Sequence, residues 1–132
     1  PVIFSHSNAR AVFDNARNVP DDILKMVKTN GGVVMVNFVG WYLGPRFDQT
    51  SYKDVAHHLD HIKNFIGVDH VGIGSDFDGV WFSTNGLFDV SDFPRLLMEL
   101  LENKGWTEED IGKLTSGNVL RVMEFLNESR ST

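Results

Sequence analysis

Residues 33–39 read VVMVNFV, a continuous run of apolar and β-branched side chains interrupted by one asparagine. Such a run is typical of a β-strand that is covered on both faces, as strands of parallel sheets are. It follows a helix predicted at residues 20–29, which ends at Asn30-Gly31-Gly32 because glycine adopts the left-handed cap conformation at little cost. The stretch therefore predicts a helix followed by a buried strand, the repeating unit of α/β proteins.

The same unit recurs on both sides of this stretch. Strands are predicted at residues 2–5 and 69–75, and helices at residues 51–66, 91–103 and 118–127. Strands that alternate with helices imply a parallel sheet with helical crossovers.

This alternation leaves two architectures open. A closed (β/α)8 barrel needs eight strands and about 250 residues, whereas this chain has 132 residues and holds about three β/α units plus terminal helices. It is either a small open three-stranded sheet or the C-terminal portion of a TIM-like barrel. The apolar edges of an isolated sheet favour the barrel portion, with residues 1–132 as a single domain. The chain opens on residues 2–5, which read as a buried strand, so we also expect sequence upstream.

The composition excludes several classes of function. Twelve Lys and Arg residues against eighteen Asp and Glu residues give a net charge of −6, which argues against binding to nucleic acid or to anionic membranes. The chain has no cysteine, so disulfides, thiolate nucleophiles and iron–sulfur clusters are excluded. Any metal must be held by His, Asp or Glu. The absence of cysteine favours a reducing compartment such as the cytoplasm.

Polar residues follow each predicted strand, where the function of a parallel sheet gathers. His6 follows the first strand, Tyr42 the second, and Asp76 and Asp78 the third. Neutral imidazole is the commonest metal ligand, and carboxylates serve as general acids and bases. The strand ends therefore predict a metal-assisted hydrolase.

Each of these residues also has a structural reading. His6 is either a ligand or a histidine hydrogen-bonded at the start of a loop. Asp76 and Asp78 point the same way if the chain there is extended, so one enters the site while the other shapes a turn with Gly79, or both are turn residues. Arg17 either binds a carboxylate through two parallel hydrogen bonds or is a solvated surface residue.

Two other groups of residues are less specific. His57 and His61 have the i, i+4 spacing of helical metal ligands, but their helix belongs to the outer ring of the predicted barrel, which rarely carries its chemistry. Structural or solvated roles are favoured, with His58 beside the apolar stripe of Val55 and Ile62. Three aromatic residues either cover a pocket or pack beneath their loop: Trp81, Phe82 and Phe88.

Six motifs in a fixed order give the most specific signal. They read PVIFSHSNAR, ARNVPDDIL, GGVVMVNF, HLDHI, GIGSDFDG and GWTEEDIGKLTSGNVLRV. Together they resemble the membrane (renal-type) dipeptidases, the zinc-dependent M19 peptidases, over residues 1–128. This resemblance implies the C-terminal portion of a (β/α)8 metal-dependent hydrolase barrel that holds two zinc ions and cleaves dipeptides, including those with a C-terminal D-residue.

The resemblance also implies roles for individual residues. His6 corresponds to a zinc ligand, Arg17 to the clamp for the terminal carboxylate of the substrate, and Tyr42 to a tyrosine lining the site. Asp76 corresponds to the acid that contacts the scissile nitrogen and protonates it. The other ligands of the family lie upstream of this chain, so one expected partner is the N-terminal part of the barrel. The resemblance also implies a dipeptide substrate and, in a homodimer, a second copy of the protein.

Alternatives to this function remain. One alternative is a barrel amidohydrolase that acts on acylated amino acids or lactones. The other is a catalytically incomplete fragment, because catalytic zinc takes three protein ligands and water. The cysteine-free chain, with Phe13 where animal members have a cysteine, favours a bacterial type. An extracellular or membrane-anchored location, as in animal relatives, is the alternative.

Overall fold

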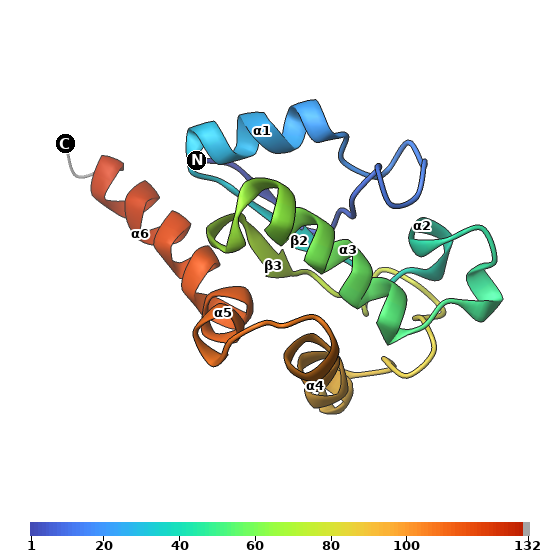
Figure 1. The fold of residues 1–132 in the computed structure, drawn as a ribbon. Helices are drawn as coiled ribbons and strands as arrows, with labels where there is room; N and C mark the ends of the chain where they lie inside the picture. Colours follow the sequence, from blue (N-terminus) through green and yellow to red (C-terminus); the bar gives the residue numbers. More distant parts are fainter. Residues whose placement is uncertain (131–132) are drawn as a thin grey trace.

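The structure of the chain, a computed structural model, describes residues 1–130. In this part of the chain three short strands alternate with six α-helices and several single turns (Figure 1). The strands and α-helices are β1 (Ile3–Phe4), α1 (Asp21–Asn30), β2 (Val33–Val36), α2 (Gly40–Leu43), α3 (Tyr52–Ile66), β3 (Val71–Ile73), α4 (Phe93–Asn103), α5 (Glu108–Gly112) and α6 (Asn118–Arg130). The single turns are η1 (Phe47–Gln49), η2 (Val68–His70), η3 (Val90–Asp92) and η4 (Lys113–Gly117).

The strands form one parallel sheet in the order β1-β2-β3. The central strand β2 is buried, as its unbroken apolar run predicts. β1 lies at an edge, and its residues Val2 and Ile3 are 46% and 37% exposed. The prediction that this first strand is buried is therefore wrong in this sheet, because no described strand pairs with its outer edge.

The assigned strands are shorter than predicted, but their hydrogen-bond ladder continues past their carboxyl ends. Ser7 donates its backbone N–H to Met35 (2.9 Å), and Gly74 donates to Val36 (2.9 Å). Phe38 donates to the carbonyl of Ser75 at 3.1 Å. The three segments that follow the strands therefore remain side by side at the edge of the sheet where the candidate residues lie.

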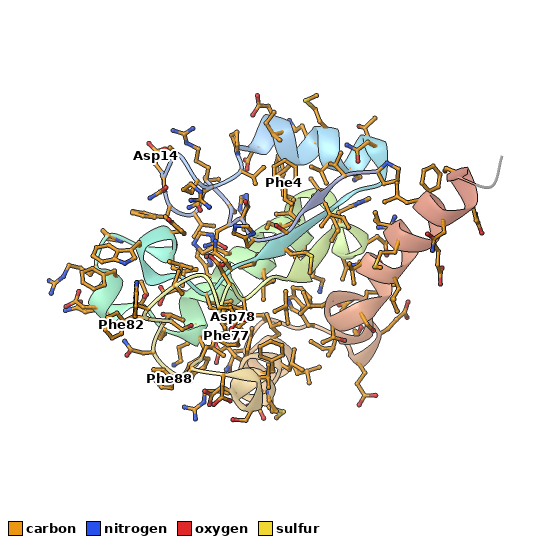
Figure 2. The ribbon with its side chains drawn as sticks, turned by 180° about the vertical axis from the view of Figure 1, so that it is seen from behind. Phe4, Asp14, Phe77, Asp78, Phe82 and Phe88 are labelled. Carbon is orange, nitrogen blue, oxygen red and sulfur yellow. The ribbon has the colours of Figure 1, made fainter. Side chains whose placement is uncertain are left out.

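Helices α1 and α3 lie on one side of the sheet, with α4 beside α3 (Figure 1). Seen from behind, the strands lie in front of α3 (Figure 2). The core lies between the sheet and these helices and is made of aliphatic side chains that water does not reach. They include Leu24, Val27, Val34, Val36, Leu59, Ile62, Val71 and Leu96.

The ends of the helices follow the capping residues of the sequence. Gly31 ends α1 with a φ of 77°, and the α3 N-cap Ser51 forms a reciprocal capping box with Asp54. Pro20 is the N-cap of α1 rather than a first-turn residue, because its ψ of 158° is extended. Helix α2 has no side-chain cap, and no local pattern of residues predicts it.

The last helix starts beneath the sheet and runs away from it (Figure 1). At its start, Asn118 donates from Nδ2 to the carbonyls of Val68 and Val71 at 2.6 and 2.8 Å. The apolar residues of this helix are only partly buried: Val122 is inaccessible, whereas Met123 and Leu126 are about half exposed. No described helix is long and apolar enough to cross a membrane.

The close approach of Ser5 and Gly74, which directly follow β1 and β3, predicts the effect of one substitution. A Cβ on Gly74 would overlap the carbonyl oxygen of Ser5 and lie 2.9 Å from Cβ of Met35. We expect Gly74→Ala to lower the free energy of unfolding by about 2 kcal/mol, because overpacking forces backbone to move. Denaturant titration measures the change. Gly112→Ala is the control, since no atom lies within 4 Å of the added Cβ; equal losses would contradict the close approach.

Candidate active site

His6 follows β1 and is half-buried. Its Nδ1 lies 2.7 Å from the hydroxyl oxygen of Ser5. No described residue hydrogen-bonds to Nε2. A neutral imidazole held at Nδ1 in this way presents its Nε2 lone pair, which is the arrangement of a histidine metal ligand whose other nitrogen is oriented by a hydrogen bond.

Two buried asparagines connect the chain segment that carries His6 to the end of β2. The backbone N–H of Asn37 donates to Oδ1 of Asn8 (2.8 Å), and Nδ2 of Asn8 donates to Oδ1 of Asn37 (3.0 Å). Nδ2 of Asn37 also donates to the carbonyl of His6 at 3.2 Å. These bonds fix the backbone of His6 against the central strand. Sequence reasoning missed both asparagines, because their spacing of 29 residues has no local signal.

A third buried asparagine fixes the short helix α2. The carbonyl of Tyr42 accepts from Nδ2 of Asn18 at 2.8 Å and from Nδ2 of Asn8 at 3.4 Å. Asn18 is the neighbour of Arg17 in the sequence. Through this shared acceptor, the loop that carries Arg17 and the helix that carries Tyr42 are attached to each other.

The structure brings Arg17 and Tyr42 together. The guanidinium carbon of Arg17 lies 5.2 Å from the centre of the Tyr42 ring, within the range of a cation–π contact. Arg10 and Arg46 each pair with a carboxylate, Asp14 at 2.7 Å and Asp48 at 3.2 Å. Within residues 1–130, no carboxylate pairs with Arg17, so its forked donor set is available to a carboxylate from outside.

Asp76 has an unusual backbone at the end of β3. Its φ is +64°, the one positive value among described residues other than glycine, and Gly79 donates to its carbonyl at 3.1 Å to close a turn. The expectation that Asp76 and Asp78 share one side of an extended chain is therefore wrong. A Cβ on Gly79 would overlap the carboxyl group of Asp76, so this glycine makes room for the acid. Asp76 is half-buried, while Asp78 is exposed.

His58 of α3 is completely buried beside the site, in agreement with the predicted structural role. Its Nδ1 accepts from the backbone N–H of Ala9 at 3.1 Å, and its Nε2 lies 3.1 Å from the carbonyl of Leu43. The first bond requires a lone pair on Nδ1 and the second a proton on Nε2, so the ring is neutral. Burial lowers the pKa of His58 from 6.5 to about 4.

Among the described residues, His6 is the candidate metal ligand at the carboxyl ends of the strands. Within residues 1–130, no group of three or more His, Asp or Glu side chains could hold an ion. His61 of α3 lies 3.1 Å from a carboxylate oxygen of Asp21, and His58 uses both ring nitrogens. The helix histidines therefore do not form a site by themselves. Nδ1 of His70 also has a partner, the carbonyl of Gly32 at 2.9 Å, but His70 precedes β3. His6 is the remaining candidate ligand at the carboxyl ends of the strands.

A cavity of about 350 Å³ lies between α2 and the loop after β3, and its lining includes Trp41, the neighbour of Tyr42, and Gly79, which closes the turn at Asp76. Its lining residues are mainly apolar: Trp41, Gly79, Val80, Trp81 and Phe82. Trp81 is 97% exposed, and Figure 2 shows Phe82 and Phe88 at the periphery of the molecule. Of the two readings of these aromatic residues, packing beneath their own loop is therefore wrong.

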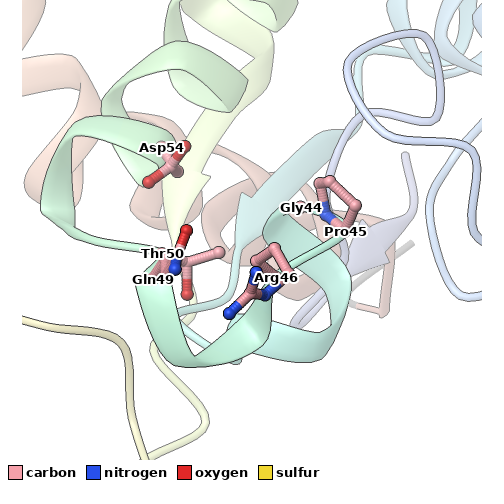
Figure 3. Close-up of a pocket in the computed structure, with 6 residues that line it drawn as sticks. All are labelled: Gly44, Pro45, Arg46, Gln49, Thr50 and Asp54. Carbon is pink, nitrogen blue, oxygen red and sulfur yellow. The ribbon is translucent and has the colours of Figure 1, made fainter.

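A second pocket, of about 210 Å³, lies where α2 leads through η1 into α3 (Figure 3). It is lined by Gly44, Pro45, Arg46, Gln49, Thr50 and Asp54. Two of its polar groups already have partners in the fold, since Asp54 accepts from the Ser51 N–H at 2.8 Å and the Thr50 hydroxyl donates to the Phe47 carbonyl at 2.8 Å. The candidate residues do not line this pocket.

Comparison with known proteins gives consistent matches along the whole chain. The family model described as membrane dipeptidase (peptidase family M19) matches residues 1–132. The chain is 47% identical over 124 residues to the dipeptidase aclJ of Aspergillus oryzae, covering 93% of this chain and 29% of that protein. It is 46% identical over 130 residues to dipeptidase 3 of Homo sapiens, covering 98% and 26%. The chain thus spans less than a third of the length of these relatives.

Solved structures agree with these matches. A metallopeptidase from Rhodobacter sphaeroides, solved with a phosphinate mimic of the dipeptide L-Ala-D-Ala, superposes with a TM-score of 0.85 at 35% identity, over 94% of this chain and 36% of that one. The metallopeptidase dipeptidase AC superposes with a TM-score of 0.82 at 35% identity, with the same coverage.

The state of His58 predicts a pH dependence of stability. Because its pKa is lower in the folded protein than in the unfolded chain, the unfolded state binds more protons between pH 6.5 and pH 4. We expect stability to be complete above pH 6.5 and to fall by about 3 kcal/mol toward pH 4 through this group. Denaturant titrations across this range measure it. In the His58→Gln variant, which has no titrating ring at this position, the free energy of unfolding should fall less over the same range. An equal fall would show that another group takes up the proton.

Proposed function

The chain belongs to the membrane dipeptidase family, peptidase family M19, and we propose that the protein containing it is a zinc-dependent dipeptidase. The support is the match of the family model to every residue, together with the high superposition scores on two M19 metallopeptidases. The observation that carries the proposal is that the ends of the three strands lie side by side, with His6, Tyr42 and Asp76 following them.

We propose further that residues 1–132 are a single domain's C-terminal portion within a (β/α)8 barrel. The parallel strand order, the exposed edge residues Val2 and Ile3, and the exposed apolar residues of α6 support this assignment. In a closed barrel each edge strand has a further neighbour, which removes such edges.

His6 is proposed to be the zinc ligand that this chain supplies. Its free Nε2 and its oriented Nδ1 fit a bound zinc ion, while the lack of a three-ligand group among the described residues requires further ligands from outside them. In two-metal hydrolases, bound zinc lowers the pKa of water and polarises the carbonyl that is attacked.

The other residues are proposed to bind the dipeptide and to move its proton. Arg17, which no described carboxylate neutralises, binds the terminal carboxylate, and the ring of Tyr42 keeps the guanidinium in place. The carboxylate of Asp76 accepts the proton that the attacking water gives up and passes it to the leaving nitrogen. Positioning both ends of the substrate restricts cleavage to dipeptides, because a longer chain places its carboxylate elsewhere.

The function of Arg17 is tested by Arg17→Lys in the complete protein. Lysine keeps the charge but loses the two parallel bonds to the carboxylate. We expect kcat/KM on a free-acid dipeptide to fall by about 2 kcal/mol, or roughly thirtyfold, as for one lost charge-assisted bond. A dipeptide with an amidated C-terminus has no carboxylate. On this substrate the Arg17→Lys variant should have nearly the same kcat/KM as the wild-type protein.

Arg10→Lys is the matched control for this experiment, because Arg10 belongs to the same loop and pairs with Asp14 on the surface. Arg10→Lys should leave kcat/KM unchanged on both substrates. If Arg17→Lys lowers kcat/KM equally on both substrates, Arg17 stabilises the fold instead of binding the carboxylate. That result would favour the alternative function, an amidohydrolase acting on lactones or acylated amino acids.

The function of Asp76 is tested by Asp76→Asn. Asparagine tolerates the left-handed backbone as well as aspartate does, so the fold should be unchanged. It has no carboxylate to accept the proton and pass it on, and we expect kcat to fall about 100-fold or more while zinc content stays constant. The matched control is Asp78→Asn two residues away, which should retain activity. Loss of zinc from the Asp76 variant would make Asp76 a metal ligand and refute its role as the acid.

A further inference from the structure

His58 is the one described histidine whose two ring nitrogens are both bound to backbone groups of other segments. The ring belongs to α3, on the helix side of the sheet, yet its two partners belong to the two segments that carry candidate site residues. Ala9 follows His6 by three positions, and Leu43 follows Tyr42 directly. An apolar side chain would fill this position in the core, but it would leave a buried N–H and a buried carbonyl unpaired, which is costly.

From this geometry we propose that His58 is a positioning residue. Its bond to Ala9 fixes the position of the segment that carries His6, and its bond to Leu43 fixes the position of the helix that carries Tyr42. The proposal rests on the proposed dipeptidase function for the roles of His6 and Tyr42, while the two hydrogen bonds themselves do not depend on it.

The contacts on the first side lead to the metal ligand. The N–H of Ala9 is held by His58, and the preceding residue, Asn8, bonds to Asn37, which in turn donates to the carbonyl of His6. Loss of the bond to Ala9 frees this segment at one end. Loss of this bond should therefore disturb the orientation of His6 more than the position of α2.

The contacts on the second side lead to the substrate clamp. Helix α2 has four residues and no side-chain cap, so bonds from elsewhere hold it in place. Its last residue, Leu43, is held by Nε2 of His58, and the carbonyl of Tyr42 is held by Asn18. Loss of the bond to Leu43 should therefore displace the ring of Tyr42, against which Arg17 rests.

Two substitutions separate the two bonds. Asparagine places its carbonyl oxygen near the position of Nδ1 and retains the bond to Ala9, whereas glutamine places its amide nitrogen near Nε2 and retains the bond to Leu43. In the complete protein, we expect His58→Gln to weaken zinc binding about tenfold, as outer partners of metal ligands do, with little change in KM. We expect His58→Asn to raise KM about tenfold while zinc binding stays near the wild-type value.

Zinc affinity is measured by competition with a chromophoric chelator, KM with a free-acid dipeptide, and amide exchange at Ala9 by hydrogen–deuterium exchange. Exchange at Ala9 should accelerate in His58→Gln alone. His57→Gln, on the exposed neighbour in the same helix, is the control and should leave all three quantities unchanged.

The results separate the positioning role from the proposed function. If both variants merely lower the melting temperature and shift zinc affinity and KM by equal factors, His58 is only a packing residue and the proposal is refuted. If the wild-type protein does not cleave dipeptides, the proposed function fails, whereas the split in Ala9 exchange and zinc affinity still supports or refutes the positioning role.

Discussion

The buried pair Asn8–Asn37 is the interaction on which the geometry of the candidate site depends. Its two bonds, of 2.8 and 3.0 Å, join the segments that follow the assigned strands β1 and β2. A buried amide without partners is costly, so the pair stabilises one arrangement of these segments and excludes others. The candidate site is thus held by hydrogen bonds between side chains and backbone, because the assigned strands are too short to fix it alone.

The elements with a regular pattern could be predicted from the sequence. The apolar run at residues 33–39, the apolar repeat of α3 and the glycine that ends α1 are local signals, and the structure agrees with each. Helix α2 could not be predicted, because its four residues depend on bonds from Asn18 and His58. The buried asparagines were missed for the same reason: their partners are distant in sequence, and asparagine after a strand predicts a loop as readily as it predicts a buried contact.

The same distinction applies to the candidate site residues. The chain order places His6, Tyr42 and Asp76 after successive strands, which suffices to predict that they share one edge of the sheet. The contact of Arg17 with the Tyr42 ring could not be predicted, since it depends on how Asn18 attaches the loop to α2. Nor could the left-handed backbone of Asp76, because the spacing of two acids gives their separation in the chain and not the turn between them.

The two glycines on either side of Asp76 explain why the motif GIGSDFDG takes this form. Gly74 allows the carbonyl of Ser5, the neighbour of His6, to approach β3, and Gly79 leaves space for the Asp76 carboxyl group. Aspartate itself tolerates the positive φ that starts the turn. A strained backbone persists only where its surroundings determine it, and here they are the segment of His6 on one side and Gly79 on the other. The steric requirements that shape the motif therefore also bring its acid to the edge of the sheet that carries the histidine.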